Sequence, residues 1–324
     1  MSGRYLARRL TTAGITILLI ILVNFFLFRA MPGSPERILG RNPNVTPELL
    51  AAKRAQWGLD KPLVPDQLIA YVGTTLQGDL GFSFLARGRP VADVLAQRVG
   101  PTLLLFGVGE ILAIVIGLAL GAYTGWRRGG PIDHVGNATS LLLYSTPYFL
   151  LGMALLLLFA GQLRWFPTFG MVTSGAQYTS VVDQWIDVGR HLVLPAATVA
   201  LGLIGQYAIV MRSSIVETLT EDYVTTARAK GLSGMRILRA HALPNAMLPT
   251  VTLIAINLGY VVAGAITVEV VFNWPGLGTL TVEALSARDY PVLQGVFLLL
   301  SVSVVLANLV ADLVYGRLDP RVRG

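Results

Sequence analysis

The chain has 324 residues, of which 54% are hydrophobic and only 13% are charged, and its mean hydropathy is +0.64. Soluble domains carry roughly 25% charged residues, so the composition excludes an ordinary soluble protein and indicates a membrane protein with several spans. The formal net charge is +7, but the basic residues are spread along the chain, which argues against nucleic-acid binding. The absence of cysteine excludes disulfides, thiolate metal ligands and a cysteine nucleophile.

Six apolar segments are long enough to cross about 30 Å of hydrocarbon as helices. They lie at about residues 10–30, 101–123, 138–160, 191–211, 247–271 and 291–314. The first is too long for the apolar part of a signal peptide, so we interpret it as a retained transmembrane helix. The sequence therefore predicts an all-α polytopic membrane protein, and Pro147 is expected to kink the third span.

The chain divides into three regions by composition. An N-terminal transmembrane helix (1–31) precedes a long polar loop or subdomain outside the cytoplasm (32–98), and a core of five helices (99–324) follows. The loop has a helical pattern at 47–56 and a glycine-rich piece, QGDLGFS. The core contains one long polar stretch, residues 213–248, between its third and fourth helices.

Basic residues in the short connections predict the orientation of the spans. The two short connections on one side hold three of them: Arg164, Arg190 and Arg288. The segments on the other side hold thirteen: Arg4, Arg8, Arg9, Arg127, Arg128, Arg212, Arg228, Lys230, Arg236, Arg239, Arg317, Arg321 and Arg323. Loops longer than roughly 60 residues cross largely regardless of charge, so the long loop is left out. Both termini and the polar stretch are therefore predicted to face the cytoplasm.

The polar stretch begins with signals for a short helix. Thr218 and Glu221 have the spacing of a capping box, and Gly231 has the position of a residue just after a helix end. We predict a helix over about 220–230, which is either a connector on the lipid headgroups or a docking helix for a soluble partner. In the docking alternative, the face in contact with the partner is Tyr223, Val224 and Ala227.

A second short helix is predicted over about 234–242. Pro244 should end it, because proline lacks the N–H that a helix interior needs. Pro249 would then lie in the first turn of the fifth span, where proline is tolerated.

Gly231, the spacer after it and Leu243-Pro244 resemble the EAA loop of permease subunits in ATP-binding-cassette (ABC) importers, the loop that carries the coupling helix. The segment EDYVTTARAKGLS, followed by HALPNAMLP, resembles the sequences of the oligopeptide, dipeptide and nickel branch, and of its B-type subunit in particular. Further phrases resemble the same family, in order along nearly the whole chain: RAMPGSP, WGLDKPL, QGDLGFS, STPYFLLG, HLVLPA, VFNWPGLG, RDYPVLQG and LDPRVR. Thr225 departs from the generic motif, which has a glutamate there.

The resemblance implies that different subunits form the pathway, bind ATP and deliver the substrate. Two permease subunits, here a heterodimer, form the pathway in the bacterial plasma membrane, two cytoplasmic ATPases bind ATP and magnesium, and an extracytoplasmic binding protein delivers the substrate. The chain itself lacks a GxxxxGK[ST] phosphate loop, so no cofactor, metal or catalytic residue is expected in it. LSGMR, at 232–236, faintly resembles the ATPase signature LSGGQ, and we interpret it as chance.

The same resemblance implies which residues couple the chain to the ATPases. They are Glu221, Asp222, Tyr223, Ala227, Arg228, Lys230, Gly231, Arg236, Leu243 and Pro244. Arg228, Lys230 and Arg236 either pair with acidic ATPase residues or remain solvated. A side chain at Gly231 would be strained if the residue is left-handed.

Polar residues inside the apolar spans are candidates for the translocation pathway, because burying them in hydrocarbon is costly. Glu110 is close to the middle of the second span, where it either meets the cationic amino terminus of a peptide or is protonated or paired with a neighbouring helix. Gln206 and Asn257 also lie mid-span, where they either line the pathway or join helices by hydrogen bonds.

The same resemblance implies a loop that faces the binding protein at the outer end of the fifth span, and its candidate residues are Glu269, Trp274, Pro275 and Gly276. Trp274-Pro275-Gly276 would form a rigid aromatic turn. The alternative is that Trp274 anchors the loop at the lipid headgroups.

Two other classes of function need features that the sequence lacks. A membrane hydrolase needs a motif such as HExxH, GxSxG or GxGD, and His134, His191 and His241 are scattered. A secondary transporter or channel without ATPases fits six spans, but no internal repeat supports it. Among substrates of the branch, oligopeptides are favoured over nickel because the spans hold few metal ligands, and glutathione is a further alternative.

Overall fold

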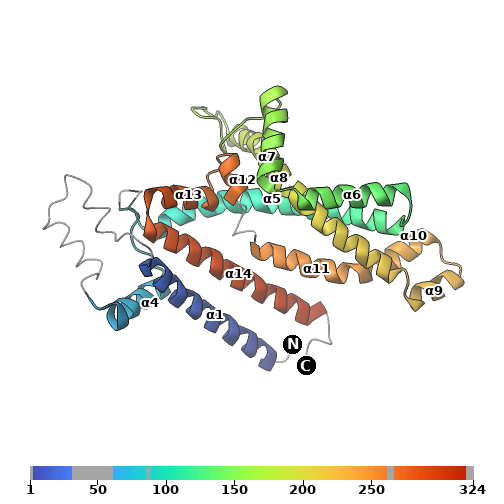
Figure 1. Cartoon of the computed structure of the whole chain (residues 1–324), viewed down its shortest axis with the longest axis horizontal. Helices are drawn as coiled ribbons and strands as arrows, with labels where there is room; N and C mark the ends of the chain where they lie inside the picture. Colours follow the sequence, from blue (N-terminus) through green and yellow to red (C-terminus); the bar gives the residue numbers. More distant parts are fainter. Residues whose placement is uncertain (1–2, 31–60, 85, 87, 261–265, 319–324) are drawn as a thin grey trace. The chain divides into compact units, whose positions relative to one another are not determined.

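The structure is a computed structural model of the chain that describes residues 3–30, 61–84, 86, 88–260 and 266–318. The helical pattern predicted at 47–56 lies outside the described residues. The regular elements of the described part are helices, with a single isolated bridge between Phe82 and Pro90. The chain forms two compact units, residues 1–100 with 280–324 and residues 101–279 (Figure 1).

The first unit is built on α1 (Gly3–Ala30) and α14 (Tyr290–Leu318), which pack against each other. It also contains η1 (Leu63–Gln67), α4 (Leu68–Leu76), the start of α5 (Val91–Trp126) and most of α13 (Leu277–Ala287). Asn24 of α1 donates from Nδ2 to the Gln294 carbonyl at 3.1 Å and to the Tyr71 hydroxyl at 3.2 Å. Interhelical hydrogen bonds of this kind stabilise helix packing in lipid, where apolar contacts alone give little driving force.

Two segments that are far apart in the sequence, QGDLGFS and RDYPVLQG, meet in this unit. The Ser83 hydroxyl of QGDLGFS donates to the Asp289 carboxylate of RDYPVLQG at 2.6 Å, and both side chains are buried. The other oxygen of Asp289 accepts from the Val292 N–H at 3.3 Å in the first turn of α14. Asp289 therefore caps the N-terminus of α14 while it ties the loop before α5 to it.

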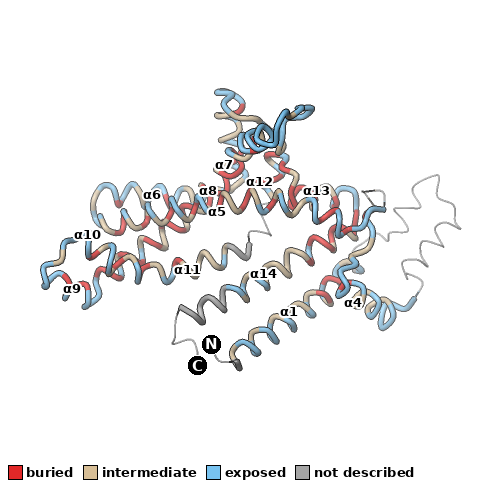
Figure 2. Tube along the Cα trace, turned by 180° about the vertical axis from the view of Figure 1, so that it is seen from behind, coloured by how far each residue is buried: buried red, intermediate tan, exposed pale blue. Residues whose placement is uncertain are grey.

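The second unit is organised around the long helix α8 (Val181–Thr218), which packs against α6, α7, α11 and α12. Its elements besides α8 and the rest of α5 are α6 (Pro131–Ser145), α7 (Tyr148–Leu155), η2 (Leu156–Gln162), α9 (Asp222–Ala229), α10 (Gly234–Ile237), η3 (Leu238–Ala242), α11 (Leu243–Tyr260) and α12 (Ile266–Val271). Buried residues follow α8 along most of its length (Figure 2).

A stripe of small residues on α5 explains how closely α8 approaches. A Cβ added at Gly117 would lie 2.6 Å from the Cβ of Tyr207, and one at Gly109 would lie 2.7 Å from the Cβ of Val199. Gly121 and Gly125 continue the stripe at four-residue spacing along the same face of α5. Larger residues would separate the two helices, so this spacing fixes α8 against α5.

Helices long and apolar enough to cross a membrane confirm a multi-pass chain. Among the described residues four single helices qualify, and the pair formed by 131–145 and 148–162, bent by 103°, makes a fifth if it is one span. The kink predicted at Pro147 is confirmed, and Thr146 before it is extended, as the residue before proline prefers. The fifth predicted span, 247–271, corresponds to α11 and α12, and residues 261–265 between them lie outside the described part.

Three local predictions in the polar stretch are wrong. Thr218 ends α8 and the next helix begins at Asp222 with Glu221 at its N-cap, so no capping box forms. Pro244 does not end the second short helix, because the π-helical segment η3 widens the backbone just before it and the helix continues into α11. Pro249 consequently lies inside α11 instead of in a first turn.

Candidate functional site

The first candidate site is the short helix α9 and the residues that fix it. Val224 and Ala227 are buried in a cluster of apolar side chains with Met211 and Ile215 of α8 and with Leu219, which directly follows α8. The same cluster includes residues of α10, η3 and α11. The face predicted to meet a partner is thus divided, because Val224 and Ala227 pack on their own chain while Tyr223 is 40% exposed.

The end of α9 is formed by Gly231. Its φ is +77°, its N–H donates to the Arg228 carbonyl at 2.9 Å, and the Leu232 N–H donates to the Ala227 carbonyl at 3.3 Å. These two bonds make a Schellman motif, in which the residue after the helix is left-handed. The predicted left-handed glycine is confirmed at this position.

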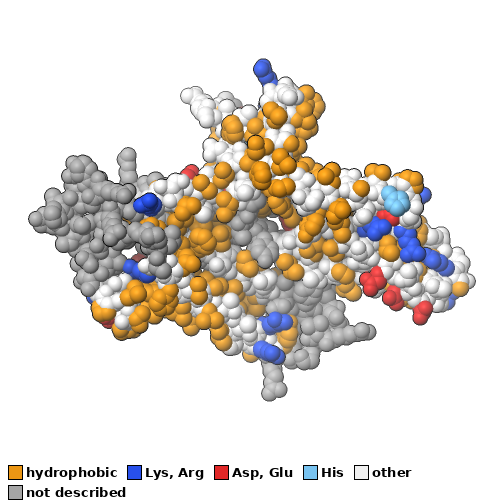
Figure 3. Space-filling view, in the orientation of Figure 1, with side chains coloured by type: hydrophobic (Ala, Val, Ile, Leu, Met, Phe, Trp, Pro, Cys, Tyr) orange, Lys and Arg blue, Asp and Glu red, His pale blue; other side chains and the backbone are white. Residues whose placement is uncertain are grey.

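The remaining coupling candidates divide by exposure. Leu243 is partly buried and packs in the same apolar cluster as Ala227. The other candidates lie exposed: Glu221, Asp222, Tyr223, Arg228, Lys230, Gly231, Arg236 and Pro244. Figure 3 shows acidic and basic side chains gathered at the end of the second unit that carries α9 and α10. A helix with a buried apolar side and a charged exposed side fits docking to a soluble protein.

An ion pair that sequence reasoning missed joins α6 to α8. Asp133 is only 2% exposed, and it accepts bonds from Arg212 Nε at 2.5 Å and Arg212 Nη2 at 2.8 Å. The Gly129 N–H donates to the same carboxylate at 2.9 Å. This two-pronged contact holds the start of α6 against α8 within one turn of the apolar cluster that anchors α9.

The structure brings the three predicted pathway residues together, through a fourth that was not predicted. The Tyr207 hydroxyl donates to Glu110 Oε1 and accepts from Asn257 Nδ2 at 3.0 Å. Asn257 Nδ2 also lies 3.4 Å from Gln206 Oε1. Glu110 and Tyr207 are 3% and 0% exposed, whereas Gln206 and Asn257 are partly exposed. We call these four side chains, which come from α5, α8 and α11, the polar chain.

The predicted binding-protein loop is built around a buried carboxylate. Glu269 accepts from the Thr102 hydroxyl at 2.7 Å and from the N–H groups of Gly278 and Thr279 at 2.7 and 3.1 Å. It thereby caps the N-terminus of α13 from a distance in sequence. A Cβ at Gly276 would collide with the Glu269 carboxylate, so the glycines of VFNWPGLG let the backbone wrap around it.

Trp274 is likewise fully buried, and its Nε1 donates to the Pro101 carbonyl at 2.9 Å. It therefore packs inside the second unit and does not anchor the loop at the lipid headgroups. Pro275, which is partly exposed, and Gly276, which is buried, complete the predicted set.

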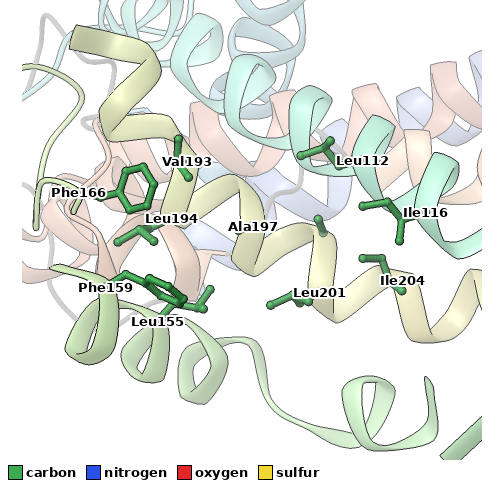
Figure 4. A pocket seen from close by; sticks show the side chains of 11 residues that line it. Leu112, Ile116, Leu155, Phe159, Phe166, Val193, Leu194, Ala197, Leu201 and Ile204 are labelled. Carbon is green, nitrogen blue, oxygen red and sulfur yellow. The ribbon is translucent and has the colours of Figure 1, made fainter. Parts of the chain in front are cut away.

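A cavity of about 340 Å³ lies beside α8 (Figure 4). Its lining is wholly apolar and comes from three regions: Leu112 and Ile116 of α5, Leu155, Phe159 and Phe166 from the α7 region, and Val193, Leu194, Ala197, Ala200, Leu201 and Ile204 of α8. None of the polar chain lines it. Within the described residues no group of three or more His, Asp or Glu residues could hold a metal ion.

Comparison with known protein families decides the class of the chain. The family model described as "Binding-protein-dependent transport system inner membrane component" matches residues 113–324, and the model of the N-terminal part of such components matches residues 2–105. The chain belongs to this family. It is the permease component of an ABC importer, so it works with an ATPase and a binding protein.

Curated relatives match over almost the whole chain. A putative peptide permease protein of Brucella suis is 41% identical over 99% of both chains. A probable peptide ABC transporter permease protein of Sinorhizobium fredii is 38% identical over 99% of both, and a glutathione transport system permease protein of Salmonella choleraesuis is 39% identical over 98% of both.

A solved structure shares the fold. The chain is similar, with a TM-score of 0.54 and 19% identity, to a chain of the MetNI methionine ABC transporter in an inward-facing conformation. The similarity covers 70% of this chain and 96% of that one. Over the matched part, the two chains therefore share a fold.

Proposed function

We propose that this permease forms half of the pathway through which an ATP-driven importer moves peptides, in particular oligopeptides, into the cytoplasm. It would be the B-type subunit, with six spans, both termini in the cytoplasm and a second, different permease as the other half. The relatives named as peptide and glutathione permeases, at 38–41% identity over nearly the whole chain, support the peptide class.

Placement of α9 is the observation that carries the proposal. Two apolar side chains, Val224 and Ala227, anchor it to the ends of α8 and α11, and its charged side remains exposed. A partner that pulls on the exposed side would therefore move α8 and α11 with it, instead of bending a loose loop.

The mechanism follows from that attachment. Two partner ATPases would bind ATP and magnesium, and their closure would displace α9 and its counterpart in the second permease. Packed helices change arrangement as rigid bodies, so the pathway would alternate between outward and inward access. This chain would hold no cofactor of its own, and Arg228, Lys230 and Arg236 would face acidic ATPase residues.

Two further regions take roles in the proposal. Glu110, Gln206 and Asn257 would lie along the pathway. The loop held by Glu269, with Trp274, Pro275 and Gly276, would present a rigid outer surface near the delivery point of the binding protein.

The proposal is tested with the purified importer, containing both permeases and the ATPases, in proteoliposomes. Binding protein loaded with an oligopeptide should stimulate ATP hydrolysis and uptake several-fold, whereas binding protein loaded with glutathione or nickel should not. Stimulation by glutathione alone would reassign the substrate within the same class. Uptake by the permease chain without ATPases would contradict an ATP-driven importer.

A further inference from the structure

The available hydrogen atoms determine which group donates and which accepts at each contact of the polar chain. The hydroxyl of Tyr207 has one hydrogen, which it donates to Glu110, so it can only accept from Asn257. The nitrogen of the Asn257 amide therefore faces Tyr207, and its second hydrogen points to Gln206 Oε1 at 3.4 Å. Glu110, which is buried, thus sets the orientation of an amide that is partly exposed.

This order leaves two groups at the exposed end. Asn257 Oδ1 accepts no hydrogen bond and Gln206 Nε2 donates none within the described part of the chain. An unsatisfied amide donor and acceptor are costly in hydrocarbon, so the exposed end must face water or a polar ligand. The cavity beside α8 is lined only by apolar residues, so it provides no hydrogen-bonding side chain for a polar ligand.

We propose that Asn257 and Gln206 bind the main-chain peptide group of the substrate during passage, and that Tyr207 and Glu110 are positioning residues that hold them. Asn257 Oδ1 accepts from the peptide N–H and Gln206 Nε2 donates to the peptide carbonyl. Every peptide carries these two groups whatever its side chains, so the contact suits a substrate class instead of one sequence. The inference rests on the proposed peptide import, and it removes Glu110 from direct contact with a cationic amino terminus.

The test compares two probes in the reconstituted importer with saturating binding protein. One is tetra-alanine, and the other is its analogue with an ester in place of the central amide, which keeps the carbonyl but loses the N–H. Asn257→Ala should lower the amide-to-ester ratio of maximal uptake rates about fivefold relative to the unmodified importer, the effect of one hydrogen bond. Gln206→Ala should slow both probes alike, because both retain the carbonyl.

The positioning residues have their own expected pattern. Tyr207→Phe and Glu110→Leu should lower the ratio as Asn257→Ala does, because they release the amide of Asn257. Glu110→Gln should keep the ratio, since its carbonyl oxygen still accepts from Tyr207. The ratio separates these roles from misfolding, because fewer folded molecules slow both probes equally. Thr252→Ala, at a partly exposed position of α11, is the matched control and should leave the ratio unchanged.

The possible results test the peptide contact, the positioning role and the proposed function separately. An unchanged ratio in Asn257→Ala overturns the peptide contact. A lowered ratio there, with an unchanged ratio in both Tyr207→Phe and Glu110→Leu, overturns the positioning role. If Asn257→Ala fails to assemble, Tyr207→Phe, which removes a single oxygen, carries the test. An unmodified importer that takes up neither probe, and is stimulated by another ligand, overturns the proposed function instead.

Discussion

The backbone conformation of Gly231 limits which residue types can occupy the end of α9. Its φ is +77°, a region that side chains disfavour, yet an added Cβ would meet nothing within 4 Å. The cost of a substitution is therefore backbone strain alone, about 1–2 kcal/mol, and it includes no steric clash. Gly175, in the loop before α8, has the same properties, with φ of +74° and open space around it.

We expect Gly231→Val to lower the peptide taken up per ATP hydrolysed at least twofold, because a strained helix end displaces α9 from the ATPase surface. Gly231→Asn, which tolerates this backbone better, should have a smaller effect. Uptake and ATP hydrolysis measured in the same proteoliposomes give the ratio. Gly175→Val carries matched strain away from α9 and should leave the ratio unchanged; an equal drop in both valine variants would argue against a coupling role for Gly231.

Residues that bond across long sequence distances were the hardest to predict. Gly231 was found because capping is a local pattern, and Glu110, Gln206 and Asn257 because polar residues in apolar spans stand out. Tyr207 was missed, since a tyrosine is amphipathic and its neighbours in sequence do not reveal that Glu110, 97 positions away, accepts its hydrogen. The available signal was its place beside Gln206, because a buried hydroxyl needs a partner.

At the scale of helices, the ion pair between Asp133 and Arg212 fixes α6 to α8. Asp133 is buried, while the Arg212 side chain is 28% exposed. Removing the arginine would leave a buried carboxylate with little access to water, and among the described residues only the Gly129 N–H would still donate to it, which destabilises the contact.

Arg212→Gln is therefore expected to reduce the stability of the second unit by about 2–3 kcal/mol. Asp133→Asn in the same molecule should recover part of that loss, because it removes the unpaired charge. Thermal unfolding of the detergent-purified chain measures both. Arg98→Gln is the control, since its pair with Glu283 at 3.0 Å is more exposed and should contribute less than about 1 kcal/mol. Equal losses in Arg212→Gln and Arg98→Gln would contradict a special role for Asp133.

The prediction of helices succeeded where length and apolar composition decide, as for α1, α5, α8 and α14, and where proline acts locally, as at Pro147. It failed at Pro244. A proline usually ends a regular α-helix, but here it follows a π-helical turn that accommodates it. It also gave no warning that Glu269 and Trp274 are buried, since the loop folds around a carboxylate that its own glycines accommodate.

At the scale of the whole molecule, orientation in the membrane is the property on which the proposed function depends. If α9 is to meet cytoplasmic ATPases, the short connections rich in arginine and lysine must lie inside. The loop between η2 and α8 must then lie outside. Tyr178 of that loop donates from its hydroxyl to the Asp187 carboxylate of α8 at 2.6 Å, and this bond raises the pKa of Tyr178.

The absence of cysteine makes this orientation directly testable, because a single introduced cysteine has no background. Ser174, in the outer loop, and Ser233, between α9 and α10, are both exposed, whereas Thr198 in α8 is fully buried. In intact cells that lack the ATPases, a membrane-impermeant maleimide should label Ser174→Cys and spare Ser233→Cys. Permeabilisation should expose Ser233→Cys, and Thr198→Cys should stay unlabelled throughout. Labelling of Ser233→Cys in intact cells would place α9 on the outer side, where no ATPase could reach it.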